Sequence, residues 1–164
     1  MAAGKTAVGK AFARYIGWPF RDTDILIEER AGKSITDIFK EDGEKAFREL
    51  ERQIIAEITQ KKNAIVALGG GAVTQEHNWK RIEKSGITIW LKTPVDVLDQ
   101  RIARQTHRPL MANLSPQQRR EKIVTMLEER RAYYQRAQFT FCRPATSSID
   151  ETVQHIFTTL LEEL

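Results

Sequence analysis

The first residues of the chain have types and spacing suited to binding phosphate. The second half of the phosphate-binding loop pattern Gly-x-x-x-x-Gly-Lys-Ser/Thr is present as Ala3, Gly4, Lys5 and Thr6 at the start of an expected helix. Glycine lets the backbone approach a phosphate, and the free amides of a helix start attract anions. In this pattern the lysine reaches the β- and γ-phosphates and the threonine binds magnesium. The residues are compatible with a nucleotide site, but this fragment alone is equally compatible with an ordinary helix start that carries a solvated lysine.

Two aspartates, Asp22 and Asp24, follow a short extended run over residues 18–22. Alternate residues of a strand point to the same side, and the carboxyl ends of parallel strands carry the ligand-binding loops. One carboxylate can support a magnesium ion, commonly through water, while the other can accept a proton from a substrate hydroxyl. A helix cap beside a solvated carboxylate is the structural alternative.

The elements that must position these residues alternate between helical periodicity and short apolar runs. This alternation predicts an α/β domain around a parallel sheet. We expect helices over residues 5–16, 25–30, 43–60, 94–104, 115–136 and from 148 onward. We expect further strands over 64–68, 87–91 and 139–142. No repeat or Ser/Gly-rich linker interrupts the sequence, which predicts a single domain over 1–164.

Apolar spacing predicts the inward faces of two helices. In the helix over 43–60 these residues are Phe47, Leu50, Ile54 and Ile58. In the last helix they are Val153, Ile156, Phe157, Leu160 and Leu161. On a face adjoining the first of these stripes, Arg48 and Glu51 lie about one turn apart, close enough to interact.

Composition narrows the functional classes. Apolar residues make up 41% of the 164 residues and charged residues 29%, which excludes disordered and collagen-like chains. The net charge of +4 suggests an anionic partner, such as a phosphorylated metabolite, a nucleic acid or a membrane surface. The single cysteine, Cys142, excludes an internal disulfide and fits a reducing, cytoplasmic compartment. No apolar run approaches the roughly 18 residues of a membrane span.

Four further motifs accompany the phosphate loop and the aspartate pair. They are Phe47-Arg48-Glu49-Leu50-Glu51, Leu68-Gly69-Gly70-Gly71-Ala72-Val73, Arg108-Pro109-Leu110-Met111 and Arg130-Arg131-Ala132-Tyr133-Tyr134. In these residues, their order and their spacing across almost the whole chain, the sequence resembles the shikimate kinase family.

The resemblance implies the three-layer α/β/α fold of P-loop kinases related to nucleoside-monophosphate kinases. It implies a five-stranded central parallel sheet, a substrate-binding region at about 24–60 and a lid at about 105–115. Met1 falls where the family has a methionine inside the phosphate loop. The chain as given is therefore expected to lack the first strand and the first loop glycine, and to be less stable and bind phosphate less well than a longer form.

The resemblance also implies roles for particular residues. Catalysis is expected from Asp24 as general base, with Lys5 and Arg108. Substrate binding is expected from Asp24, Arg48, Gly70, Gly71 and Arg130. Nucleotide binding is expected from Ala3, Gly4, Lys5, Thr6, Ala7, Arg104 and Arg108, with the adenine near residues 143–147. Magnesium is expected at Thr6 and Asp22, because the strand over 64–68 ends without an acidic residue. Glu51 is expected to orient Arg48.

The activity implied is ATP-dependent phosphorylation of the 3-hydroxyl of shikimate, in the chorismate pathway to aromatic amino acids. ATP, shikimate and Mg²⁺ are the expected partners, and the protein is expected to be a cytoplasmic monomer. The alternatives are another small-metabolite kinase, such as a gluconate kinase, or a nucleotide-binding module without turnover. A nucleic-acid binder is disfavoured because basic and aromatic residues are not interleaved, and no membrane partner is expected.

Overall fold

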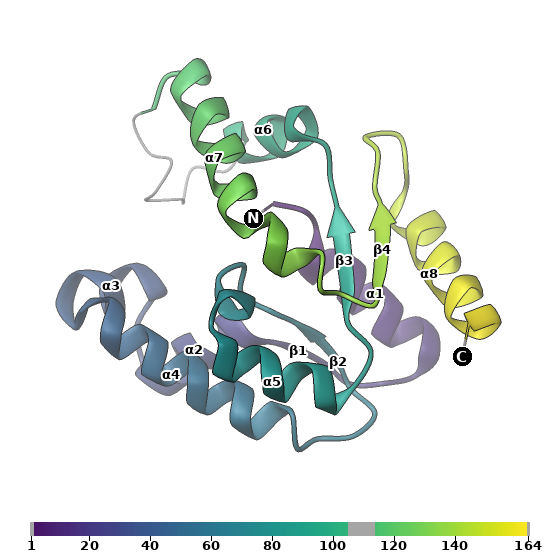
Figure 1. Cartoon of the computed structure of the whole chain (residues 1–164), viewed down its shortest axis with the longest axis horizontal. Coiled ribbons are helices and arrows are strands. Elements are labelled where there is room, and N and C mark those ends of the chain that lie inside the picture. Colours follow the sequence, from purple (N-terminus) through teal and green to yellow (C-terminus); the bar gives the residue numbers. More distant parts are fainter. Residues whose placement is uncertain (1, 105–113, 164) are drawn as a thin grey trace. The chain divides into compact units, whose positions relative to one another are not determined.

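The structure, a computed structural model, describes residues 2–104 and 114–163 (Figure 1). Internal contacts divide the chain into two compact units. We call Thr6–Thr88 the N-terminal unit, and Met1–Lys5 together with Ile89–Leu164 the C-terminal unit. A single domain over 1–164 remains a prediction.

Helices and strands alternate along the described residues, which confirms the predicted α/β class. Up to residue 58 they are α1 (Lys5–Ile16), β1 (Phe20–Asp22), α2 (Thr23–Ala31), α3 (Ile35–Glu41) and α4 (Gly43–Ile58). Up to residue 103 they are β2 (Ile65–Ala67), η1 (Ala72–Thr74), α5 (Glu76–Ser85), β3 (Ile89–Lys92) and α6 (Val95–Ala103). Beyond residue 113 they are α7 (Pro116–Tyr134), β4 (Phe139–Cys142) and α8 (Ile149–Glu163).

Each unit contains one pair of parallel strands. In the N-terminal unit β1 pairs with β2, and Asp22 lies opposite Ala67 at the carboxyl end of the pair. In the C-terminal unit β3 pairs with β4, and Lys92 lies opposite Cys142. Because parallel strands end at the same edge, the loops that follow β1 and β2 emerge together.

Helix caps fix the start of the helices that build the N-terminal core. The Asp22 side chain accepts a hydrogen bond from the Asp24 amide and begins α2, while the Ser34 side chain accepts one from the Asp37 amide and begins α3. The core of this unit then joins residues from α2, α3 and α4. They are Ile27, Ile38, Phe47 and Ile54.

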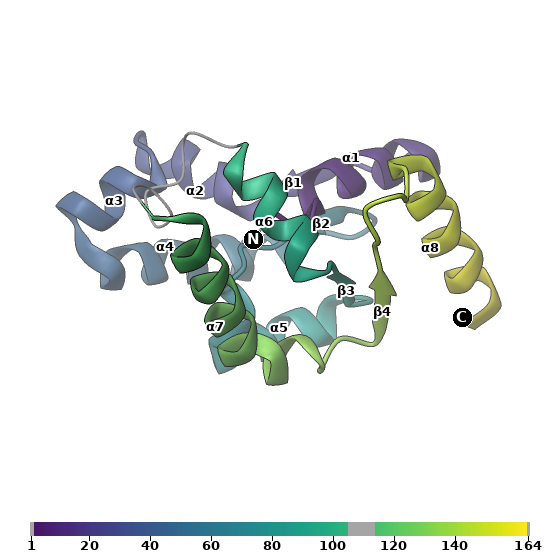
Figure 2. The ribbon, with the colours of Figure 1, turned by 90° about the horizontal axis from the view of Figure 1, so that it is seen from above.

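The core of the C-terminal unit lies between α6 and α7, which are side by side in Figure 2. Its buried members are Leu98, Ile102 and Ile123. Ala2 and Ala3 pack against this cluster, so the start of the chain is held on the α6–α7 core.

Ion pairs and a helix cap strengthen the contact between α6 and α7. Arg119 Nε lies 2.6 Å from Asp99 Oδ1, and Arg120 pairs with Asp96. Ser115 and Gln118 form a capping box at the start of α7.

Four features differ from the sequence analysis. The short helix η1 and helix α5 were not predicted, although Trp79 and Ile82 stand three residues apart and both are buried in α5. Leu161, expected to face inward, is 67% exposed because it lies in the last turn of α8. Pro94 precedes α6 as its N-cap rather than opening its first turn.

Within the described ranges, no helix is both long enough and apolar enough to cross a membrane.

Removing the Ile27 side chain should destabilise the N-terminal unit. Ile27 is fully buried in the cluster of α2, α3 and α4, whereas Ile25 on the same helix is 43% exposed. We expect Ile27→Ala to lower the free energy of unfolding by about 2–5 kcal/mol, because it leaves a cavity. Urea denaturation followed by circular dichroism measures this loss. Ile25→Ala is the matched control, and equal losses in the two variants would contradict the packing described here.

Candidate active site

Asp22 and Thr6 are joined by a hydrogen bond within the N-terminal unit. Thr6 Oγ1 donates to Asp22 Oδ2 at 2.7 Å, while Asp22 Oδ1 accepts from the Asp24 amide at 3.1 Å. One carboxylate therefore both begins α2 and contacts the first turn of α1. The side-chain oxygens of Thr6 and Asp22 form a donor set of the kind that Mg²⁺ prefers.

These oxygens fit magnesium bound largely by phosphate and water. Among residues 2–104 and 114–163 no group of three or more His, Cys, Asp or Glu side chains could hold a metal ion by itself. Mg²⁺ commonly keeps several waters and binds one or two protein ligands together with substrate phosphates. The Thr6 hydroxyl and the Asp22 carboxylate are therefore enough protein ligands for a magnesium ion of this kind.

Thr23, between the two aspartates, holds the end of β1 to the loop after β2. It is fully buried, and its Oγ1 donates to the Ala67 carbonyl at 3.4 Å and accepts from the Gly69 amide at 2.8 Å. The sequence analysis did not select this residue. Thr23 opens α2 directly after β1, and its role depends on β1 pairing with β2, which no local pattern in the sequence shows.

The loop Gly69–Gly71 lies directly against two charged side chains. A Cβ on Gly69 would stand 2.6 Å from Asp24 Oδ1. A Cβ on Gly71 would stand 3.1 Å from Arg48 Nη1 and 3.2 Å from Arg48 Nη2. A side chain at Gly69 would force Asp24 to shift, and one at Gly71 would press on Arg48. The loop thus brings a carboxylate and a guanidinium to one stretch of backbone.

Arg48 is held by two carboxylates of its own helix. Arg48 Nη1 donates to Glu51 Oε2 at 2.9 Å, so the expected one-turn contact is present. Glu51 is only 1% exposed, and a buried carboxylate paired with a guanidinium fixes both groups. Arg48 Nε and Nη2 also donate to Glu44 Oε1, each at 3.2 Å. Glu44, four residues before Arg48, was not selected from the sequence.

The residues just before α1 are held within the C-terminal unit. Arg101 Nη1 donates to the Ala2 carbonyl at 3.1 Å, and Thr93 Oγ1 donates to the Ala3 carbonyl at 3.5 Å. Gly4 has a left-handed φ of +88°, which disfavours any other residue. The Arg143 guanidinium lies against Gly4. The backbone that leads into Lys5 is therefore fixed by side chains from three later segments.

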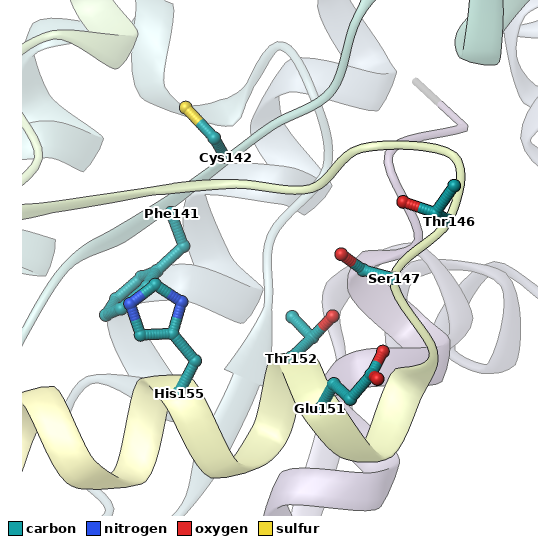
Figure 3. A pocket seen from close by; sticks show the side chains of 7 residues that line it. All are labelled: Phe141, Cys142, Thr146, Ser147, Glu151, Thr152 and His155. Carbon is teal, nitrogen blue, oxygen red and sulfur yellow. The ribbon is translucent and has the colours of Figure 1, made fainter.

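A cavity of about 420 Å³ in the C-terminal unit lies between β4 and the start of α8 (Figure 3). Its lining residues are Phe141, Cys142, Thr146, Ser147, Glu151, Thr152 and His155.

Local contacts fix the walls of this cavity. The His155 ring meets the Phe141 ring edge-on at 5.2 Å. Hydrogen bonds from the Ser148 amide and hydroxyl lower the pKa of Glu151. Thr146 and Ser147 belong to the stretch expected to lie near adenine, and that expectation stays a prediction.

The predicted site residues are distributed over both units. In the N-terminal unit Thr6 and Ala7 lie in the first turn of α1, and Asp24 and Arg48 lie at the glycine loop that contains Gly70 and Gly71. The C-terminal unit contains Ala3, Gly4, Lys5, Arg104 and Arg130, of which Arg104 follows α6 and Arg130 lies on α7. Arg108 and most of the expected lid lie outside the described residues.

Parallel α/β architecture, a Gly-Lys-Thr helix start and paired aspartates at a strand end together define the class of P-loop kinases. The family profile described as shikimate kinase matches residues 1–161. The chain belongs to the shikimate kinase family.

Curated relatives and solved structures agree with this assignment. The chain is 36% identical over 160 residues to shikimate kinase of Microcystis aeruginosa, with 98% of this chain and 82% of the relative covered. It is 43% identical over 141 residues to that of a Synechococcus species, with 85% and 69% covered.

Two solved shikimate kinases share the fold. The enzyme of Acinetobacter baumannii, solved in complex with shikimate, has a TM-score of 0.90 at 34% identity, with 99% of this chain and 89% of that chain covered. The enzyme of Bacteroides thetaiotaomicron has a TM-score of 0.92 at 36% identity, with 99% and 94% covered. The predicted P-loop kinase fold is confirmed.

Adding a methyl group to Gly69 should displace Asp24. The methyl carbon would lie within van der Waals overlap of Asp24 Oδ1, so the carboxylate or the loop must move. We expect Gly69→Ala to cost about 1–3 kcal/mol in urea denaturation, the usual range for overpacking, and to shift the Asp24 side chain in a crystal structure.

Gly86→Ala provides the control for this variant. Gly86 has an extended φ of 168°, and a Cβ there meets open space. We expect it to leave both stability and the Asp24 position unchanged. An unmoved Asp24 and unchanged stability in Gly69→Ala would show that the loop does not constrain this carboxylate.

Proposed function

We propose that this protein transfers the γ-phosphoryl group of ATP to the 3-hydroxyl of shikimate. Membership of the shikimate kinase family supports this activity, as does the similarity to a relative solved with shikimate bound. The observation that carries the proposal is the convergence of Asp24 and Arg48 on the loop Gly69–Gly71. The resemblance further supports a monomer of one domain as the working unit.

The acceptor chemistry requires one group for a carboxylate and another for a hydroxyl proton. The planar guanidinium of Arg48 suits a carboxylate, because it can donate two parallel hydrogen bonds. Asp24 would accept the hydroxyl proton as the oxygen attacks phosphorus. Gly70 and Gly71 would contact the substrate through their backbone, and Arg130 would provide a second guanidinium for the carboxylate.

Phosphoryl transfer depends mainly on positioning and charge stabilisation. Lys5 would contact the β- and γ-phosphates, and the backbone amides of Ala3, Gly4 and Ala7 would donate hydrogen bonds to phosphate oxygens. Arg108 would stabilise the charge on the transferred group, and Arg104 would contact the nucleotide.

Thr6 and Asp22 would hold the magnesium ion that accompanies the nucleotide. When bound, Mg²⁺ neutralises charge on the β- and γ-phosphate oxygens. The hydrogen bond between Thr6 Oγ1 and Asp22 Oδ2 holds both oxygens in place before nucleotide arrives. Asp22 is also the cap of α2, so this arrangement is fixed by the fold rather than by the ion.

A coupled assay of ADP release with shikimate, with gluconate and without an acceptor tests the proposal. ADP release that requires shikimate is the expected result. Preference for gluconate would favour a related sugar-acid kinase, while nucleotide binding without turnover would identify a binding module. Either result would overturn the proposed activity.

Replacing Asp24 with asparagine should remove the base while preserving the shape of the side chain. We expect Asp24→Asn to lower kcat by about 10²–10⁴-fold, the range associated with general-base catalysis. Isothermal titration calorimetry should find ADP binding unchanged. Asp150→Asn, at an exposed position in the first turn of α8, controls for the loss of one negative charge. Turnover of Asp24→Asn close to that of the parent protein would assign the base elsewhere.

Replacing Asp22 with asparagine should weaken the binding of Mg²⁺ by the protein. We expect Asp22→Asn to raise the Mg²⁺ concentration for half-maximal turnover by about ten-fold or more, as for other metal-supporting carboxylates. The Asn side chain can still cap α2, so the fold should persist. A magnesium titration at saturating ATP and shikimate measures the effect, and an unshifted midpoint would remove Asp22 from the metal site.

A further inference from the structure

Arg143 follows β4 at the carboxyl end of the β3–β4 pair. Its amide donates to the Lys92 carbonyl at 2.8 Å, which extends the pairing of the two strands by one residue. In parallel α/β sheets the loops at this end of the strands carry the ligand sites. Its backbone is therefore fixed by strand pairing at the edge where ligands bind.

The Arg143 side chain is buried without a compensating charge among the described residues. The residue is only 7% exposed, and Nε has no hydrogen-bond partner within residues 2–104 and 114–163. The ion pairs formed by that part of the chain do not include Arg143. Burial and the nearby Arg101 both lower its pKa. Burying a cation without an anion beside it costs free energy. The surroundings of Arg143 therefore suit the binding of an anionic ligand.

The guanidinium of Arg143 is directed at the start of α1. Arg143 Nη1 lies so close to Gly4 that a Cβ there would overlap with it, and Arg143 Cζ would stand 3.6 Å from the same Cβ. Arg101 Nη1 would stand 3.7 Å from that position and also donates to the Ala2 carbonyl. Two guanidinium groups therefore meet at the glycine where the twelve-residue helix α1 begins.

We propose that Arg143 binds a phosphoryl group of the nucleotide at Gly4, with Arg101 as the second cation beside it. The ligand class is a nucleoside di- or triphosphate, recognised through its phosphates. This inference rests on the proposed function and adds a residue to it. It also differs from the expectation for residues 143–147, because it directs Arg143 to phosphate rather than to adenine.

Three probes separate phosphate recognition from base recognition. Inorganic pyrophosphate has only the phosphates, adenosine has only the nucleoside, and ADP has both. Titration calorimetry of the full chain with each probe should show that Arg143→Met binds pyrophosphate and ADP about ten-fold more weakly or worse, the loss expected for a hydrogen bond to a charged group. Adenosine binding should be unchanged.

Two further variants complete the comparison. Arg143→Lys keeps the charge but loses the planar fork, so its pyrophosphate affinity should fall between those of the parent and Arg143→Met. Arg131→Met removes an exposed arginine of α7 and should bind all three probes as the parent does.

Thermal unfolding gives a readout that does not depend on activity. Pyrophosphate should raise the Tm of the parent protein, because a ligand of the folded state stabilises it. It should raise the Tm of Arg143→Met less. Removal of an unpaired buried charge should leave the Tm without ligand equal or higher. If Arg143→Met does not fold, Arg143→Lys takes its place in both measurements, with the same direction of change.

The outcomes distinguish this inference from the proposed function. Parent-like binding of pyrophosphate by the Arg143 variants, in a protein that turns over shikimate, overturns the inference alone. Weakened adenosine binding with unchanged pyrophosphate binding also overturns it, by assigning Arg143 to the base. A parent protein without shikimate-dependent turnover overturns the proposed function, whatever the Arg143 variants bind.

Discussion

The arrangement of the N-terminal site depends on the close approach of the loop Gly69–Gly71 to the carboxyl end of β1. Thr23 sets this approach, because its hydroxyl bonds both to the last carbonyl of β2 and to the Gly69 amide. With the two strand ends joined in this way, a side chain at Gly69 would displace Asp24 and one at Gly71 would crowd Arg48. A buried hydroxyl thus places a carboxylate and a guanidinium against bare backbone.

The same constraint explains why helix α4 carries a charge in its buried face. Glu51 is almost fully buried, and its cost is offset by the ion pair with Arg48. Glu44 occupies the outer edge of the same guanidinium. The carboxylates of its own helix therefore fix the orientation of Arg48, and the guanidinium packs against the backbone of Gly71. A group intended to bind a substrate carboxylate is preorganised in this way without help from the substrate.

Two arginines, Arg48 and Arg143, have opposite electrostatic surroundings. Arg48 is surrounded by carboxylates, whereas Arg143 is buried beside Arg101 and has no ion-pair partner among the described residues. A guanidinium that is paired with carboxylates, like Arg48, is fixed in its orientation. A buried guanidinium without such a partner, like Arg143, attracts an anion. Two of the basic residues behind the net charge of +4, Arg101 and Arg143, lie beside Gly4 at the start of α1.

The sequence by itself determined the α/β class, most helices, and the pairing of Arg48 with Glu51, because periodicity and one-turn spacing are local properties of the chain. It indicated Asp22 and Asp24 but not Thr23, whose role depends on β1 lying beside β2. Arg143 was likewise selected only as part of a stretch. Burial, a missing counter-charge and contact with Gly4 arise when residues distant in sequence pack together, and only the tertiary structure decides that packing.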